Sequence, residues 1–156
     1  MQNRVSIVNK ICAKYGKNNC LYVSIHVNAA GSDGNWKNAG GWCAFTTKGN
    51  TKSDIAAECF YKEAEAELKE YELIMANGIK QGVYSKQQRP YRTDKADGDK
   101  DLESNFYVIY YSKCPAVLTE NLFQDNPEDV AYLTSERGIN AIVNLHVNGV
   151  IKYFER

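Results

Sequence analysis

Apolar residues along the first fifteen positions recur at spacings of three and four. Val5, Val8, Cys12 and Tyr15 would share one face of a helix, because one helical turn takes 3.6 residues. Gly16 follows directly, and glycine is a common stop signal at a helix end. The pattern predicts a helix over this opening segment.

The pattern changes at residues 21–27, where β-branched and aromatic residues dominate. Such a run predicts a strand, and its continuous apolar character indicates burial on both faces. Residues 28–41 hold four glycines and several small polar residues, a composition typical of a loop. Residues 41–47 predict a second strand, which ends at the polar residues 48–50.

A long amphipathic pattern begins near Ser53. This residue is a good N-cap, and Asp54 and Glu58 are placed to favour the positive end of a helix. One apolar stripe continues from there, while most charged residues fall off it. The stripe consists of Ala56, Phe60, Ala64, Leu68, Tyr71 and Met75. The pattern predicts a single helix of about six turns that ends near Asn77 and Gly78.

Residues 82–104 form a long polar segment. Alternating acids and a glycine at 94–101 invite comparison with a calcium-binding EF-hand loop, but the final acidic ligand and the flanking helix pair are missing. We therefore predict a surface loop, and loops of this length are often functional. The hypothesis is that this loop flanks the cleft beside His26 and contacts substrate through Tyr91 and Arg92; the alternative is a disordered surface connection.

The C-terminal third alternates apolar runs with helix signals. Residues 106–111 and 116–120 both predict strands, and the second is a short buried strand that ends at Glu120. Asn126 and the following proline mark a helix start. A last helix is predicted over residues 136–153. Because strands and helices alternate along the chain, the fold class is α/β.

Composition narrows the possible functions. The 156 residues are 44% hydrophobic, which predicts one domain with its own core. Nineteen basic residues balance nineteen acidic ones, so no positive excess attracts nucleic acid or an anionic membrane. The longest apolar runs are only a few residues, far short of the ~20 that span a bilayer.

The sequence shows neither a signal peptide nor a cysteine motif that would indicate a function. The first residues lack the apolar core of a signal peptide, so we expect the chain to stay in the cytoplasm unless lysis releases it. The cysteine count is odd, and no pair is spaced as Cys-x-x-Cys. Both features favour free thiols that act as small apolar residues. The five cysteines are Cys12, Cys20, Cys43, Cys59 and Cys114.

Two side chains stand out as candidates for chemistry. His26 lies at the C-terminal end of the first predicted strand, before a glycine-rich loop, and Glu120 ends another predicted strand. Open α/β sheets place their sites at such strand ends. An imidazole and a carboxylate there would suit metal-assisted hydrolysis. The alternative is a satisfied histidine and a solvent-facing glutamate at strand edges.

Several segments resemble the zinc-dependent N-acetylmuramoyl-L-alanine amidases of the α/β sheet type. Residues 24–30, Ser-Ile-His-Val-Asn-Ala-Ala, are similar to that family's zinc-histidine segment. Residues 115–123, Pro-Ala-Val-Leu-Thr-Glu-Asn-Leu-Phe, and residues 125–129 resemble its catalytic-glutamate segment and the next helix start. Residues 4–10 and 149–153 resemble two of its helices. The order is that of the family, and the match covers nearly the whole chain.

The resemblance implies a specific chemistry. The family holds one zinc ion with two histidines and a glutamate and leaves a position for water. By resemblance, His26 is the second histidine ligand and Glu120 is the general base. The bond cleaved is the amide between N-acetylmuramic acid and L-alanine in peptidoglycan. Zinc suits this reaction because it lowers the pKa of bound water to about 7. The implied fold is a twisted, mixed, mostly parallel sheet flanked by helices.

The sequence also departs from the family pattern. The family's first strand carries a histidine in a Gly-His-Gly turn, and the next helix carries a glutamate ligand; neither segment has a counterpart here. We therefore expect residues 1–156 to form a single, partial amidase domain. His146 lies in the last predicted helix, where the family pattern places no ligand. The predicted outcome is weak zinc binding, and the alternative is a non-catalytic remnant or peptidoglycan-binding module without zinc.

Overall fold

The computed structural model describes residues 1–94 and 98–156, in which helices and strands alternate along the chain. The helices are α1 (Gln2–Tyr15), η1 (Lys17–Asn19, a 3₁₀ turn), α2 (Lys52–Glu67), α3 (Lys69–Gln81), α4 (Tyr107–Tyr110), α5 (Pro127–Leu133) and α6 (Glu136–Phe154). The strands are β1 (Tyr22–Asn28), β2 (Cys43–Thr46), β3 (Leu102–Glu103) and β4 (Ala116–Phe123). The predicted α/β class is confirmed.

The four strands form one mixed sheet in the order β1-β4-β2-β3. The β1–β4 and β2–β3 pairs are parallel, and the β2–β4 pair is antiparallel. The sheet is therefore mixed and mostly parallel, as expected. Its two longer strands, β1 and β4, lie side by side, so the segments that resemble the amidase motifs are direct neighbours.

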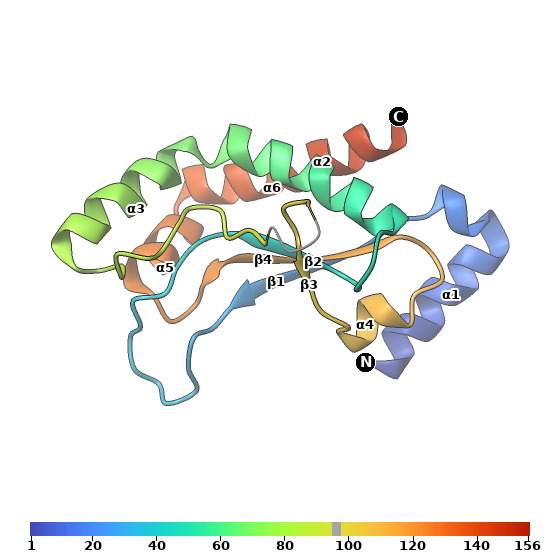
Figure 1. Cartoon of the computed structure of the whole chain (residues 1–156), viewed down its shortest axis with the longest axis horizontal. Coiled ribbons are helices and arrows are strands. Elements are labelled where there is room, and N and C mark those ends of the chain that lie inside the picture. Colours follow the sequence, from blue (N-terminus) through green and yellow to red (C-terminus); the bar gives the residue numbers. More distant parts are fainter. Residues whose placement is uncertain (95–97) are drawn as a thin grey trace.

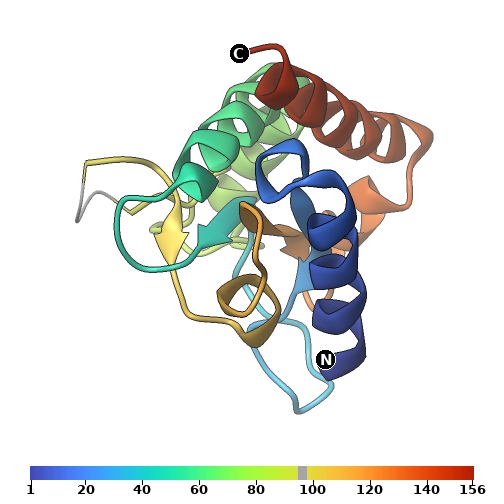
Figure 2. The ribbon, with the colours of Figure 1, turned by 90° about the vertical axis from the view of Figure 1, so that its right-hand side faces the viewer.

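Helices cover the two faces of the sheet unequally. In Figure 1, α2, α3 and α6 lie above the strands, while α1 and α4 lie below one end of them. Figure 2 shows the same two layers from the end of the molecule. The larger core lies under α2, α3 and α6, and it includes Trp42, Phe60, Tyr61, Val117 and Leu145. We call this side of the sheet the covered face.

The opposite side of the sheet has a smaller core. Val5 of α1 and two residues of α4 pack there against Ala116 and Leu118 of β4. Beyond this cluster the same side of the sheet carries His26 and Glu120, and His26 is exposed. We call this side the site face, because both candidate residues lie on it.

The first strand differs from its prediction in burial. β1 forms where expected, but Ile25 is 60% and Val27 is 45% exposed. The physical reason is its place in the sheet: β1 is an edge strand whose only described neighbour is β4. The prediction of burial on both faces is wrong, whereas the predicted helix over α1 is confirmed.

The long helix predicted from Ser53 to Gly78 is two helices. The chain leaves helical geometry at the buried Leu68, which has φ −95° and ψ 23° and separates α2 from α3. Thr51 caps α2 through a capping box with Asp54, so Ser53 is not the cap. The Ser53 hydroxyl instead accepts a hydrogen bond from the Ala116 amide at 3.0 Å. α3 continues to Gln81 and ends at Gly82, which adopts the left-handed conformation.

The strand predicted at residues 106–111 is wrong, because this segment contains the short helix α4. Val108 and Ile109 are consecutive and both buried. In a strand, two neighbouring side chains point to opposite faces. A helical turn instead directs both toward α1 and β4, while Tyr110 and Tyr111 remain exposed.

The end of the chain follows its prediction more closely. Asn126 caps α5 by accepting hydrogen bonds from the amides of Glu128 and Asp129. Ser135 caps α6 in the same way through the Gly138 amide. β4, however, continues three residues beyond Glu120. Glu120 therefore lies within the strand and is not its last residue, since pairing with β1 extends to Phe123.

Candidate functional site

His26 and Glu120 are brought together by the pairing of β1 with β4. They are direct partners in the parallel register, so their side chains leave the sheet on the same face. Cys43 of β2 pairs with Glu120 from the other side. The three residues form one row across the site face, with the carboxylate in the centre.

A short hydrogen bond links the histidine to its own strand. Nε2 of His26 lies 3.1 Å from the hydroxyl oxygen of Ser24, two residues earlier. Ser24 is buried, whereas the His26 side chain is exposed. The contact restricts the orientation of the imidazole on the site face.

The strand is irregular directly after the glutamate. Between His26 and Asn28 on β1, the partner strand advances by one extra residue, from Glu120 to Phe123, which is a β-bulge. Leu122 has φ 63°, a left-handed conformation that costs free energy in a branched residue. The Leu122 side chain is packed into the core of the covered face. Strained backbone of this kind is concentrated at functional sites.

Asn121 holds the bulge in place. Its side-chain amide donates to the His26 carbonyl at 2.9 Å, and its side-chain oxygen accepts from the Trp42 indole at 2.9 Å. Asn121 is almost fully buried, so these bonds tie β4 to β1 and to the start of β2 beside the two candidate residues.

The Glu120 carboxylate is half-buried and incompletely paired. Its Oε2 atom is buried and has no hydrogen-bond partner within residues 1–94 and 98–156. Burial raises the pKa of Glu120, and the positive charge of Arg92 partly opposes this change. A carboxyl group with a raised pKa is suited to accept and return a proton near neutral pH. Burial likewise raises the pKa of the Cys43 thiol to about 12, so this neighbour stays protonated.

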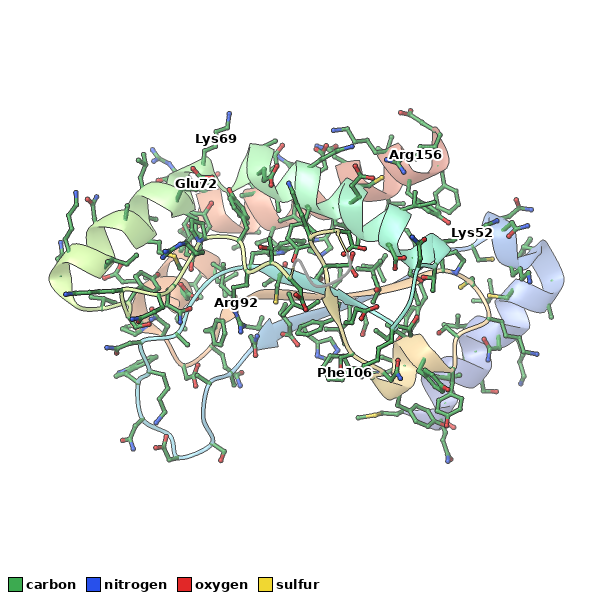
Figure 3. The ribbon with its side chains drawn as sticks, in the orientation of Figure 1. Lys52, Lys69, Glu72, Arg92, Phe106 and Arg156 are labelled. Carbon is green, nitrogen blue, oxygen red and sulfur yellow. The ribbon has the colours of Figure 1, made fainter. Side chains whose placement is uncertain are left out.

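Tyr91 and Arg92, the two loop residues predicted to contact substrate, have opposite surroundings. Tyr91 packs against the core of the covered face. Arg92 lies next to the site, with its guanidinium carbon 5.2 Å from the centre of the Phe123 ring. Figure 3 shows Arg92 near the ends of the central strands. Arg92 thus brings the segment 82–104 to Phe123 of β4, while a substrate contact by this loop stays a prediction. Residues 95–97 of the EF-hand-like run lie outside the described residues.

His146, the second histidine, is enclosed in the covered face. Its Nδ1 atom lies 2.7 Å from the Ile142 carbonyl oxygen, and its Nε2 atom lies 2.9 Å from the Thr119 hydroxyl. The side chain is 8% exposed, and burial lowers the pKa of its imidazole. Both ring nitrogens are therefore engaged, and His146 is not available as a ligand on the site face.

The described residues offer few ligands for a metal ion at this site. His26 and Glu120 are chemically suitable, because imidazole and carboxylate both bind zinc. Within the described ranges, however, no group of three or more His, Cys, Asp or Glu side chains is arranged to hold a metal. Structural and catalytic zinc sites use at least three protein ligands. The described residues do not complete such a site.

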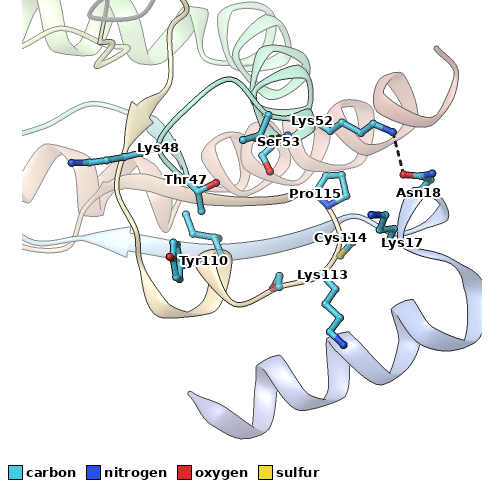
Figure 4. Close-up of a pocket in the computed structure, with 13 residues that line it drawn as sticks. Lys17, Asn18, Thr47, Lys48, Lys52, Ser53, Tyr110, Lys113, Cys114 and Pro115 are labelled. Atoms are coloured by element: carbon cyan, nitrogen blue, oxygen red, sulfur yellow. Dashed lines mark hydrogen bonds between the residues drawn. The ribbon is translucent and has the colours of Figure 1, made fainter.

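One hollow lies away from this row. A hollow of about 570 Å³ is lined by Lys17, Lys48, Lys52 and Lys113 among others, near Pro115 at the start of β4. In Figure 4 the lysine side chains around it point in different directions, and Lys52 donates a hydrogen bond to Asn18.

All five cysteines are free thiols, as predicted. No helix in the described part of the chain could span a membrane.

Sequence reasoning did not identify the residues that support the candidate pair. Ser24 could have been found, because residues i and i−2 of a strand share a face. Asn121 and Thr119 carried no such signal, since their partners Trp42 and His146 are distant in sequence. Their roles depend on contacts that only the folded chain creates.

Comparison with known proteins assigns the chain to a family. The family model of the N-acetylmuramoyl-L-alanine amidases matches residues 1–152. The chain is 41% identical over 51 residues to the amidase CwlM of Bacillus licheniformis, covering 33% of this chain and 20% of that protein. It is 27% identical over 130 residues to an endolysin of Bacillus phage SPP1, covering 83% and 38% of the two chains.

A solved structure extends the comparison to the fold. The N-acetylmuramoyl-L-alanine amidase from Clostridium difficile 630 superimposes with a TM-score of 0.67 at 21% identity. The superposition covers 99% of this chain and 64% of that structure, so the chain spans less than two thirds of each of these three relatives. With the family model matching almost every residue, this chain belongs to the N-acetylmuramoyl-L-alanine amidase family.

Proposed function

We propose that this chain contributes to peptidoglycan hydrolysis by cleaving the amide between N-acetylmuramic acid and L-alanine. The observation that carries the proposal is the pairing of His26 with Glu120 on the site face, where one carboxylate oxygen of Glu120 has no described partner. Family membership supports the substrate class. One endolysin among the relatives is consistent with an action on cell walls.

In this proposal Glu120 is the general base and then the general acid. Hydrolysis of an amide requires a base that takes a proton from the attacking water and an acid that protonates the leaving amine. A half-buried carboxylate with a raised pKa can do both in turn. The bulge at Leu122 and the bonds of Asn121 would hold the Glu120 backbone while it acts.

His26 is proposed as a zinc ligand. Family members supply a metal-activated water, and an exposed imidazole oriented by Ser24 is a suitable donor. His26 is one of only two histidines in the 156 residues, and the other is engaged by Thr119 and Ile142. The donors among residues 1–94 and 98–156 therefore do not fit a complete zinc site, and we derive no reaction step through the metal.

Because the described residues do not complete a zinc site, zinc-dependent activity can be tested directly. The 156-residue chain with added zinc is expected to release little peptide from purified peptidoglycan, compared with a chelator control. A base alone contributes only about 10²–10⁴ in rate. Fusing a strand and a helix that carry a histidine and a glutamate ligand should raise zinc-dependent release by at least about the same factor.

Two variants of the fusion protein complete this test. His26→Ala and Glu120→Ala should each abolish the gained activity. Retained activity in Glu120→Ala would remove the general-base assignment. Robust zinc-dependent turnover by the 156-residue chain alone would show that it holds zinc through residues other than those proposed.

The same donor set favours a second candidate, a module that binds muramyl peptide without cleaving it. Zinc-independent binding by the chain, unchanged in His26→Ala, together with an inactive fusion protein would support this binding role over catalysis.

A further inference from the structure

β1 forms one edge of the sheet, and its sequence does nothing to prevent further pairing. Within residues 1–94 and 98–156 its only strand neighbour is β4. Edge strands of soluble proteins are commonly protected by lysine, by proline or by a short length. β1 has seven residues and contains neither lysine nor proline. Its outer side is therefore a surface that can accept another strand.

The backbone of β1 shows which residues face outward. The Tyr22 amide donates to a carbonyl directly before β4 at 2.9 Å, and the His26 carbonyl accepts from a β4 side chain at 2.9 Å. Both residues thus turn their backbone polar groups toward β4. Because these directions alternate along a strand, the amides and carbonyls of Val23, Ile25 and Val27 point away from the sheet.

The side chains of these outward residues lie on the covered face. Ile25 is the register partner of Thr119, whose hydroxyl contacts His146 of α6, and register partners direct their side chains to the same face. Ile25 and Val27 are nevertheless exposed. Part of the covered face beside β1 therefore has no helix over it.

α6 borders this uncovered strip with a second apolar row. One side of α6 packs on α2, where Gly149 lies against the Phe60 ring. On the helical wheel, the side of His146 that is turned away from Gly149 carries apolar residues at a spacing of four. They are Ile139, Val143, Val147 and Ile151, followed by Phe154, and each is about half exposed.

α1 carries a third row. The side chain of Asn9 is hydrogen-bonded to the backbone of segment 111–113, which holds that side of α1 against the connection between α4 and β4. Ile7, Ile11 and Tyr15, again spaced by four, lie on the opposite side of the helix and are exposed. Figure 2 shows α6 and α1 on the right, whereas α2 and β3 lie on the left. β1 and β3 are the two opposite edges of the sheet.

We propose that this open edge, formed by β1 and the exposed rows of α6 and α1, is an interface between two copies of the chain. Its main parts are self-complementary. Two β1 strands related by a two-fold axis pair antiparallel, and a helix ridge with a spacing of four packs into the matching groove of an identical helix. The net charge of the chain is zero, so two copies do not repel each other at long range.

The apolar surface of the open edge is that of a stable dimer. Within residues 1–94 and 98–156, ten of the eighteen exposed large apolar residues lie on it. The chain exposes 8848 Å², and a standard interface buries about a tenth of such a surface, roughly 800 Å² per partner, around an apolar centre. Ten exposed apolar side chains supply such a centre.

The two-fold axis runs perpendicular to the sheet, because the two edge strands pair side by side. The site faces of both copies then lie on the same side of one continuous sheet, and both His26–Glu120 pairs face the same way. None of the ten apolar residues is a candidate for the reaction, so the interface is independent of the proposed function.

Sedimentation velocity of the 156-residue chain at increasing concentration tests the interface. We expect a species of twice the 17.6 kDa of one chain, with a dissociation constant in the micromolar range or tighter. Changing both Val143 and Val147 to glutamate should weaken the dimer at least about a hundredfold, because like charges would meet across the axis. Both side chains are exposed in the single chain, so this variant should fold.

Two further variants locate the contact. Ile25→Pro removes an outward-facing amide and leaves the bonds between β1 and β4 in place, so it should also weaken the dimer. Leu73→Glu is the matched control, since Leu73 of α3 is 68% exposed and lies outside the open edge. It should leave the dissociation constant unchanged. Circular dichroism during thermal unfolding shows that each variant is folded.

Hydrogen exchange supplies a second readout. The amides of Val23, Ile25 and Val27 should exchange more slowly as the dimer forms, whereas the Tyr22 amide is already bonded in one chain and should change little. Loss of this concentration dependence is expected in the variant with glutamate at 143 and 147.

Three results would overturn the proposal. The first is a chain that stays monomeric at every concentration; protection of the same amides only after fusion of the strand and helix described above would show that such a segment occupies the open edge instead. The second is a dimer that neither the glutamate variant nor Ile25→Pro weakens, since its interface would lie elsewhere. The third is an open-ended series of oligomers, which a closed two-fold interface does not allow.

Discussion

On the covered face of β4 a polar side chain is hydrogen-bonded, whereas on the site face a buried polar atom has no described partner. Thr119 points to the covered face, where its hydroxyl meets the His146 imidazole at 2.9 Å. Glu120, the next residue, points to the site face and has a buried oxygen without a described partner. Burying a polar group costs little when it is hydrogen-bonded and much when it is not.

Asp129 of α5, which lies against the end of β4, is a second carboxylate to compare with Glu120. Asp129 accepts hydrogen bonds from the hydroxyls of Tyr71 and Tyr84, both at 2.6 Å, and from the Phe123 amide at 2.8 Å. It is fully buried and completely paired. Thr119 and Asp129 thus help to hold the fold together through their hydrogen bonds, whereas the unpaired Glu120 oxygen lies on the face where we propose that the protein acts. Five predictions test this difference.

Asp129→Ala should have the largest effect on stability. The change leaves two tyrosine hydroxyls and one backbone amide without their acceptor in a buried site. Loss of one member of such a network typically costs about 3–5 kcal/mol. Urea unfolding followed by circular dichroism measures the effect. A loss below about 1 kcal/mol would contradict the role given to this carboxylate.

His146→Ala should cost about 2–3 kcal/mol. It removes one of the two partners of the buried Thr119 hydroxyl, the other being the Asn121 side-chain amide at 3.3 Å. It also removes the packing of the imidazole against Phe60, whose ring centre is 5.8 Å away. The double variant with Thr119→Val should lose less than the sum of the two single changes, because the valine needs no hydrogen-bond partner. Strict additivity of the two losses would argue against coupling between these residues.

The same histidine predicts a pH dependence. Burial lowers the folded-state pKa of His146 below its unfolded value of about 6.5. The folded state then binds fewer protons than the unfolded state as pH falls below that value, so stability is full above it and declines toward acid. The drop in unfolding free energy between pH 7 and pH 5 should be smaller in His146→Ala than in wild type. An identical drop would contradict the assignment.

Glu120→Gln should raise stability slightly, by about 0.5–1 kcal/mol at pH 7. An amide avoids the cost of burying a charge, and functional sites commonly exchange stability for activity. The matched comparison is Asp129→Asn, which should lower stability, because an amide accepts fewer of the three hydrogen bonds. Destabilisation by Glu120→Gln of more than about 1 kcal/mol would show that the carboxylate has a structural role.

His26→Ala should have the smallest effect on stability, within about 0.5 kcal/mol. The side chain is exposed, and its bond to Ser24 is at the sheet edge. The contrast with His146→Ala is the direct test, since both variants remove one imidazole. Equal losses would remove the distinction between the two faces.

Local patterns in the sequence were enough for the elements whose signals are local. Spacing and a stop residue identified α1, and the capping residue Asn126 identified the start of α5. The motif segments at residues 24–30 and 115–123 identified the family, which is confirmed, and named His26 and Glu120 as candidates, which remain a prediction. Each of these depends on a few adjacent residues, so neighbours in the chain carry the information.

Tertiary structure decided the features that depend on distant partners. Residues 106–111 have strand-like composition but form α4, because two adjacent side chains are buried on one side. β1 is exposed because it lies at the sheet edge, a position that no local pattern encodes. The segment containing Arg92 reaches Phe123 of β4 because Gly41 and Trp42 anchor it across some fifty residues of chain. Composition and motif named the candidate chemistry, while long-range packing decided which polar groups are paired and which remain available.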